Sequence, residues 1–172
     1  MRIVDCHAIE QCLLKHEMVR EAECYKSPFG KVHITISQRI PVLAVVSSNG
    51  YYYVDSDRRV MPIRGEVDKN LPMLKGAVTE RAAMAEYFDF VSWLRDDKYW
   101  KERIRAIHVK TSKYIVLTQE GSDAKIILGE LEDYEDKLAK LRQLYTKGFD
   151  QIGYPEYREY DLRFDNQVVG RK

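Results

Sequence analysis

The sequence has no long apolar run, little net charge and few cysteines, and each shortage excludes a class of protein. No stretch reaches the roughly 18 consecutive apolar residues that a membrane-spanning helix needs. The 28 basic and 27 acidic residues leave a formal charge of +1, so no field of one sign draws the chain to nucleic acid or to a bilayer. With 45% apolar and 32% charged residues among its 172, the chain is typical of a folded core inside a charged surface.

The three cysteines, Cys6, Cys12 and Cys24, all lie near the N-terminal end. Their odd number allows one disulfide with a free thiol, or three buried thiols, and does not decide the redox compartment. Cys12 and His16 share a face of an expected helix, while Cys24 and His33 flank a turn, so a zinc site would need all four at one spot. Buried thiols and surface imidazoles explain these residues better. We predict no metal and no cofactor.

The motifs that mark common enzymes are missing together. No Gly-x-Ser-x-Gly elbow or phosphate-binding glycine loop occurs, and Cys6-His7 are neighbours in sequence rather than a spatial pair. His108 lies among core residues of an expected strand, which favours a structural or surface histidine over a catalytic base. The carboxylates Asp96-Asp97 and Glu130–Asp133 flank helices, where acidic residues have a structural role. Tyr51–Tyr53 lack the basic cluster of a nucleic-acid surface. We therefore predict a protein that is not an enzyme and binds no nucleic acid.

The first 40 or so residues predict a small helix–strand–strand unit. We expect a helix over Ala8–Lys15 and strands over Met18–Lys26 and Lys31–Gln38, joined by the turn Ser27–Gly30. A helix and one hairpin are marginal alone, so we expect that preceding elements are missing. Arg39–Pro41 favours a stiff extended joint to the next unit, because Pro restricts both itself and the residue before it.

The remainder predicts an antiparallel sheet with helices packed on one face, which makes the fold class α+β. Thr79 is the expected N-cap of the first helix of this part, and Gly148 the expected stop of the second. We expect helices over Thr79–Arg95 and Asp133–Lys147, and strands over Val42–Val46, Tyr51–Val54, Ala106–Lys110, Tyr114–Thr118, Lys125–Leu128 and Tyr157–Phe164.

The last strand is the unusual element. Tyr157–Phe164 is long and alternating, with Tyr160, Leu162 and Phe164 on one face, and Asp165–Gln167 interrupts it before Val168–Gly170. A terminal strand often has one unpaired flank. The free N–H and C=O groups on that flank must be protected from unwanted pairing or used to bind a partner. Its alternating charges suit either blunting or the selection of a partner strand, and Phe164 suits either an interface or the core.

The same segment resembles a known family. Tyr160–Val169 is similar to the terminal signature of the bacterial cell-division protein family FtsQ/DivIB. Further resemblances follow in family order along nearly the whole chain: Ile36–Val42, Tyr52–Asp55, Val60–Pro62, Leu71–Gly76, Ile127–Gly129 and Lys137–Leu141. The family's opening POTRA strand and helix have no counterpart here, and the tail ends in Gly170–Lys172 where some relatives place an aromatic residue.

The resemblance implies a partial POTRA domain (helix plus β-hairpin) over residues 1–41 and an FtsQ-type β domain over 42–172. It implies a periplasmic fragment of a single-pass inner-membrane protein, whose N-terminal helix is absent from this sequence. Such a protein is a non-catalytic divisome scaffold that binds FtsB and FtsL, among other divisome proteins, by strand addition at its C-terminal sheet edge. The partner-binding positions carried over are Tyr160, Arg163, Phe164, Asn166, Val168 and Val169.

Two other functions remain open from the residues. A POTRA-type chaperone or transport module for outer-membrane protein assembly would have several tandem POTRA units and a following barrel. An enzyme with an unfamiliar site would have a deep polar pocket with strongly shifted titrating groups.

Overall fold

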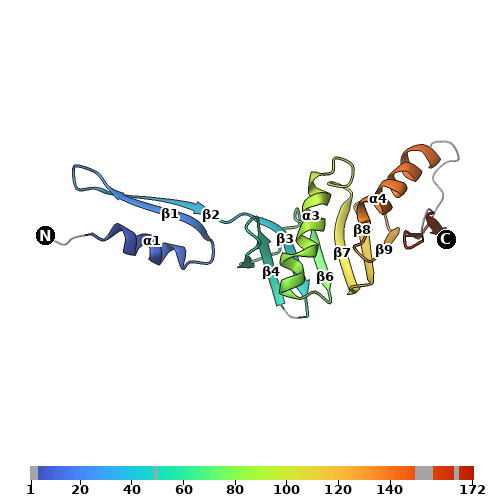
Figure 1. Ribbon diagram of the computed structural model, residues 1–172, viewed down its shortest axis with the longest axis horizontal. Coiled ribbons are helices and arrows are strands. Elements are labelled where there is room, and N and C mark those ends of the chain that lie inside the picture. Colours follow the sequence, from blue (N-terminus) through green and yellow to red (C-terminus); the bar gives the residue numbers. More distant parts are fainter. Residues whose placement is uncertain (1–3, 49, 150–156, 165–166) are drawn as a thin grey trace.

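The structure, a computed structural model, describes residues 4–48, 50–149, 157–164 and 167–172. A helix and a hairpin project from one end of a large sheet, and helix α4 (Tyr134–Gln143) lies near the other end (Figure 1). The sheet order is β11-β10-β9-β8-β7-β6-β3-β4-β5. The α+β class predicted from the sequence is confirmed.

The projecting unit consists of α1 (Cys6–Leu14), β1 (Val19–Lys26) and β2 (Val32–Gln38), close to the predicted bounds. The Asp5 carboxylate accepts the N–H of Ala8 at 3.1 Å and so caps α1. Cys24 lies opposite Ile34, whereas His33 lies opposite Tyr25. Because neighbouring residues of a strand point to opposite faces, Cys24 and His33 do not meet across the turn as a metal site would require.

The sheet is mixed rather than antiparallel throughout, which corrects the prediction. Its strands are β3 (Pro41–Ser47), β4 (Gly50–Asp55), β5 (Val60–Pro62), β6 (Met73–Gly76), β7 (Ile104–Thr111), β8 (Tyr114–Gln119), β9 (Lys125–Gly129), β10 (Glu159–Asp161) and β11 (Val169–Arg171). Three pairings are parallel: β3 with β6, β6 with β7, and β9 with β10. Parallel neighbours need a crossover. Helices α2 (Glu80–Met84) and α3 (Glu86–Asp96) supply it between β6 and β7, and α4 supplies it between β9 and β10.

The helices are α2 (Glu80–Met84), α3 (Glu86–Asp96), α4 (Tyr134–Gln143) and the π-helical turn η1 (Leu144–Gly148). Thr79 caps α2 as predicted, since its hydroxyl accepts the N–H of Ala82. The single helix expected as far as Arg95 is broken at Ala85 (φ −111°, ψ −106°), and Arg58 Nη1 donates to the Met84 carbonyl next to the break. Gly148 does not lie beyond the second helix as expected: it is the last residue of η1, and Phe149 after it still has right-handed helical φ and ψ (−78°, −23°).

The main core lies between the sheet and the helices. Leu43, Leu74, Ile107, Leu117 and Ile126 form its floor, one from each of five adjoining strands, and each is fully buried. From the helices, buried side chains that complete this core are Ala83, Phe90, Val91, Leu94, Leu138 and Leu141. A second, small cluster of Ala44, Tyr53 and Met61 lies on the opposite face of the sheet. The helices therefore cover one face of the sheet (Figure 1).

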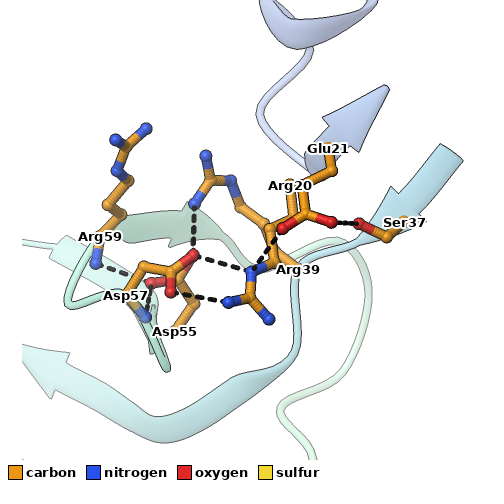
Figure 2. Close-up of polar contacts among 7 residues, drawn as sticks. All are labelled: Arg20, Glu21, Ser37, Arg39, Asp55, Asp57 and Arg59. Atoms are coloured by element: carbon orange, nitrogen blue, oxygen red, sulfur yellow. Dashed lines mark hydrogen bonds and ion pairs between the residues drawn. The ribbon is translucent and has the colours of Figure 1, made fainter. Parts of the chain in front are cut away.

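Two residues, Arg39 and Ile40, separate β2 from β3. Arg39 Nη1 lies 2.6 Å from Asp55 Oδ2, and Asp55 Oδ1 also accepts the backbone N–H groups of Asp57 and Arg59. Arg20 of β1 reaches Asp57 at 3.0 Å (Figure 2). The projecting unit is therefore held to the sheet by side-chain contacts as well as by the chain itself.

Candidate partner-binding edge

The strand predicted over Tyr157–Phe164 is much shorter in the structure. β10 covers only Glu159–Asp161, and the Leu162 N–H makes one further bond to the Ile127 carbonyl. The chain then turns, because the Asp161 carboxylate accepts the N–H of Arg163 at 3.2 Å and so competes with the sheet for the backbone. Asp161, rather than the interruption after Phe164, ends the strand.

The expected open flank has also moved. β10 pairs with β9 on one side and with β11 on the other, so the prediction that this strand leaves one flank unpaired is wrong. β11 is the terminal strand of the sheet order. Among the described residues, Val169–Arg171 pair with β10 alone, which makes β11 the C-terminal edge of the sheet.

The edge is anchored by one buried carboxylate. Asp161 is fully buried and accepts two hydrogen bonds from the Arg163 guanidinium, at 2.9 Å and 2.7 Å. Arg171 of β11 donates to the same carboxylate at 3.3 Å. The hydrogen bonds from Arg163 lower the pKa of Asp161, against the effect of burial, which raises it. The anion therefore links β10, the turn after it and the edge strand.

The loop residues after β10 are shaped by close packing. The Arg163 side chain fills the space beside Gly129, where an added Cβ would lie 2.7 Å from Arg163 Cγ. The Arg163 guanidinium carbon lies 5.3 Å from the centre of the Tyr114 ring, within cation–π range. Arg163 is consequently held in one orientation beside the edge.

The predicted partner-binding residues occupy different environments. Tyr160 is buried at 5% exposure, with its ring edge-on to Tyr145 and Tyr157, so its place is under the helices. Phe164 is 43% exposed and lies outside the core. The rest are exposed Arg163, half-buried Val168 and Val169, and Asn166, which lies outside the described residues.

The sequence reasoning missed Asp161 and Arg171. Alternation with buried Tyr160 and Leu162 placed Asp161 on the face away from the core, where a charged residue suggests solvent. The structure instead buries Asp161 fully. The Asp161-x-Arg163 spacing was the available signal, since a carboxylate two residues before an arginine can form a local ion pair once the chain turns.

Within the described ranges, no group of three or more His, Cys, Asp or Glu side chains is arranged to hold a metal ion. No described helix is both long enough and apolar enough to cross a membrane. At this edge, the hydrogen bonds with Arg163 lower the pKa of Asp161 and raise the pKa of Arg163, while burial raises the pKa of Tyr160.

Comparison with known families assigns both parts of the chain. The family described as FtsQ/DivIB, C-terminal related, matches residues 40–171, and the POTRA-like domain family matches residues 1–37. A search of curated proteins found no significant match. The first match covers most of the 172 residues. The chain therefore belongs to the FtsQ/DivIB family of cell-division proteins and carries a POTRA-like domain at its N-terminal end.

Proposed function

We propose that this protein is a non-catalytic scaffold of the divisome, and that it binds the FtsB–FtsL pair by adding a partner strand to β11. One observation carries the proposal: β11 ends the sheet, and its outer flank is unpaired among the described residues. Free N–H and C=O groups on such a flank are the template for strand addition.

The two ends of the sheet differ in how well they suit a visiting strand. At the far end, β5 contains Pro62, which has no N–H to donate and is a common protection of an edge. β11 reads Val169-Gly170-Arg171, so each of its residues carries a backbone donor and an acceptor. The C-terminal end is the better template on backbone chemistry alone.

The surroundings of β11 supply side-chain anchors. Each hydrogen bond to a visiting strand contributes about 0.5–1.5 kcal/mol net, so backbone pairing over three residues needs apolar contacts beside it. Phe164, which is 43% exposed, and half-buried Val169 offer apolar surface. Arg163 presents a cation that Asp161 has already oriented, and it suits an acidic partner residue. Tyr160 is buried in the core and anchors β10, the strand with which β11 pairs.

The family also supports a location and a division of the chain. We propose that residues 42–172 form the β domain, that residues 1–41 are the C-terminal part of a POTRA domain, and that both face the periplasm. In the complete protein, a single N-terminal helix would anchor them in the inner membrane. Phe29 is 91% exposed in the turn between β1 and β2, and Figure 1 shows this hairpin and the C-terminal end of the chain at opposite ends of the molecule.

That residue provides a matched control for the binding test. We expect Phe164→Ala to weaken binding of the FtsB–FtsL ectodomain about tenfold or more, with no change in melting temperature, whereas Phe29→Ala should bind as the wild type does. Isothermal titration and circular dichroism give the two readouts. Equal affinities for the wild type and Phe164→Ala would refute the site.

Strand addition itself has a separate signature. Amide hydrogen exchange at Val169–Arg171 should slow in the complex, because a new ladder protects the outward N–H groups. If Phe164→Ala weakens binding while these amides exchange at the same rate in the free and bound states, the partner uses side-chain contacts alone and the strand-addition mechanism is wrong.

A further inference from the structure

The projecting unit places two of the three cysteines against each other. Cys6 lies in the first turn of α1 and Cys24 lies in β1, and a hydrogen bond joins their side chains. A second contact fixes the same junction, since the Glu10 carboxylate accepts the backbone N–H of Cys24 at 2.7 Å. Glu10 lies four residues after Cys6, so the two side chains project from one face of α1. Both contacts bring this face of the helix onto β1 at Cys24.

The Cys24 side chain points toward the helix. Its neighbours Glu23 and Tyr25 are exposed, whereas Cys24 is 9% exposed. Adjacent residues of a strand point to opposite faces, and α1 lies along the hairpin (Figure 1) and packs against β1. The buried face of β1 is therefore the face that α1 covers. Cys6 and Cys24 approach each other from the two sides of this contact, as a disulfide requires.

The third cysteine does not take part in this arrangement. Cys12 is exposed, whereas Cys6 is half-buried. Cys12 follows Cys6 by six residues, which turns its side chain about 120° away around the helix axis. A bond from Cys12 to Cys24 would require α1 to rotate, and the rotation would break the contact between Glu10 and the Cys24 backbone. The fold therefore divides the three cysteines into one pair and one single thiol.

The projecting unit has few apolar contacts that could hold it together. Among its described residues, 4–38, only Val19 and Cys24 are buried, and α1 contributes no buried residue. Folded units below about 40 residues usually need a disulfide, a metal or a partner. A bond between Cys6 and Cys24 would close a loop that contains α1 and the turn into β1, and would tie the helix to the hairpin.

We propose that Cys6 and Cys24 are a redox pair that forms a disulfide, and that Cys12 remains a free thiol. The inference rests on the proposed function, because disulfides persist in the oxidising periplasm. The oxidant is itself a disulfide, either of a thiol–disulfide oxidoreductase or of glutathione.

The exchange takes place in two steps. The Cys6 thiolate, which is the more accessible of the pair, attacks one sulfur of the oxidant and releases the other as a thiolate. The Cys24 thiolate then attacks Cys6 Sγ, which forms the Cys6–Cys24 bond and releases the second sulfur of the oxidant. The two protein thiols lose two protons and two electrons, and the oxidant becomes two thiols.

Oxidised glutathione tests the pair directly. After incubation, the Cys12→Ser variant should lose about 2 Da, the mass of the two thiol hydrogens. In the wild type, digestion with a protease that cleaves after glutamate separates Cys6 from Cys12 at Glu10, so mass spectrometry identifies the linked peptides. They should contain Cys6 and Cys24. The matched control, Cys6→Ser, keeps Cys12 and Cys24 and should form no internal bond.

The bond should also hold α1 on the hairpin. The Cys24 amide, which donates to Glu10, should exchange its hydrogen about tenfold or more slowly in the oxidised Cys12→Ser variant than in the reduced one. The Ile115 amide in β8, which belongs to the large sheet, should exchange at the same rate in both states. Dithiothreitol should restore the faster exchange at Cys24.

Three results would overturn the inference. Cys12→Ser could gain glutathione on its thiols without an internal bond, or the wild type could link Cys12 to Cys6 or to Cys24. Alternatively, the Cys24 amide could exchange equally fast in the oxidised and reduced states, which would show that the bond does not fix the helix. Peptide mapping of the wild type gives its answer even if a variant fails to fold.

These measurements are independent of partner binding. If the FtsB–FtsL ectodomain does not bind, the proposed function fails, and the oxidation experiment still decides the cysteine pair. If the ectodomain binds while Cys6 and Cys24 remain unlinked, the edge at β11 stands and the redox pair is wrong.

Discussion

Arg39 and Asp55 join the two parts of the molecule through an ion pair that is nearly removed from solvent. Arg39 Nη1 lies 2.6 Å from Asp55 Oδ2, and the two side chains are 10% and 1% exposed. Arg39 follows the hairpin and Asp55 ends β4 of the sheet (Figure 2). The backbone N–H of Arg39 donates to the Met18 carbonyl, so this residue binds both sides of the joint.

Arg39→Gln should therefore destabilise the protein, because it leaves a buried carboxylate without its counter-ion. Breaking a buried pair costs about 3–5 kcal/mol, and the backbone donors that remain on Asp55 place the expected loss at the lower end. Arg59→Gln is the control, since Arg59 gives Asp55 only its backbone N–H. Urea denaturation measures both, and equal stability of the two variants would contradict a structural role for the Arg39 side chain.

Asp161→Asn should loosen the C-terminal edge and change how stability depends on pH. The folded state lowers the pKa of Asp161, so its ionised form stabilises the fold above the ordinary aspartate pKa of about 3.9, and this contribution fades as pH falls through the lowered value. We expect a loss of about 1–3 kcal/mol near neutral pH that shrinks in acid. Denaturation of the wild type, Asp161→Asn and exposed Asp123→Asn over this pH range tests it, and a difference that persists unchanged in acid would rule out the charge as the cause.

Gly76→Ala should disrupt the contact between β6 and β7. Gly76 has φ +103°, and an added Cβ would lie 2.2 Å from the Val109 carbonyl oxygen. Backbone strain alone costs about 1–3 kcal/mol, and the clash adds to it. Gly121 has φ +68° with open space around it, so Gly121→Ala reports strain without a clash. Thermal denaturation should rank Gly76→Ala clearly below Gly121→Ala; the reverse order would show that the strand contact is wrong.

The three thiols should react at very different rates. Burial raises the pKa of Cys24 to about 11, and a hydrogen bond with Cys6 adds to the effect, so little reactive thiolate forms near neutral pH. Cys12 is exposed. Iodoacetamide labelling followed by mass spectrometry should modify Cys12 at least about tenfold faster than Cys24, and the difference should vanish in denaturant. Similar rates in the folded protein would contradict the packing of α1 on β1.

The local sequence pattern predicted the helices and strands well, but it did not predict which strands pair with one another. The hairpin, the N-cap at Thr79 and the meander of β7 to β9 were predicted close to their bounds, because turn residues and alternation act over a few positions. The insertion of β6 between β3 and β7 was not predicted, since the three strands are far apart in sequence. The break between α2 and α3 at Ala85 was not predicted either, because no glycine or proline marks it in the sequence.

At the candidate site, too, the sequence predicted the local features but not the long-range pairing. The alternation and charge of the C-terminal segment were enough to indicate a terminal strand, because period and residue type are properties of the chain alone. Arg163 and Phe164 were marked as partner-binding positions by the family resemblance. Which strand forms that edge depended on long-range pairing, and the turn forced by Asp161 moved the edge from Tyr157–Phe164 to Val169–Arg171. The burial of Asp161 and of Val116 arises only when distant strands are laid side by side. No local pattern encodes this burial, because the cross-strand neighbours of both residues lie on other strands.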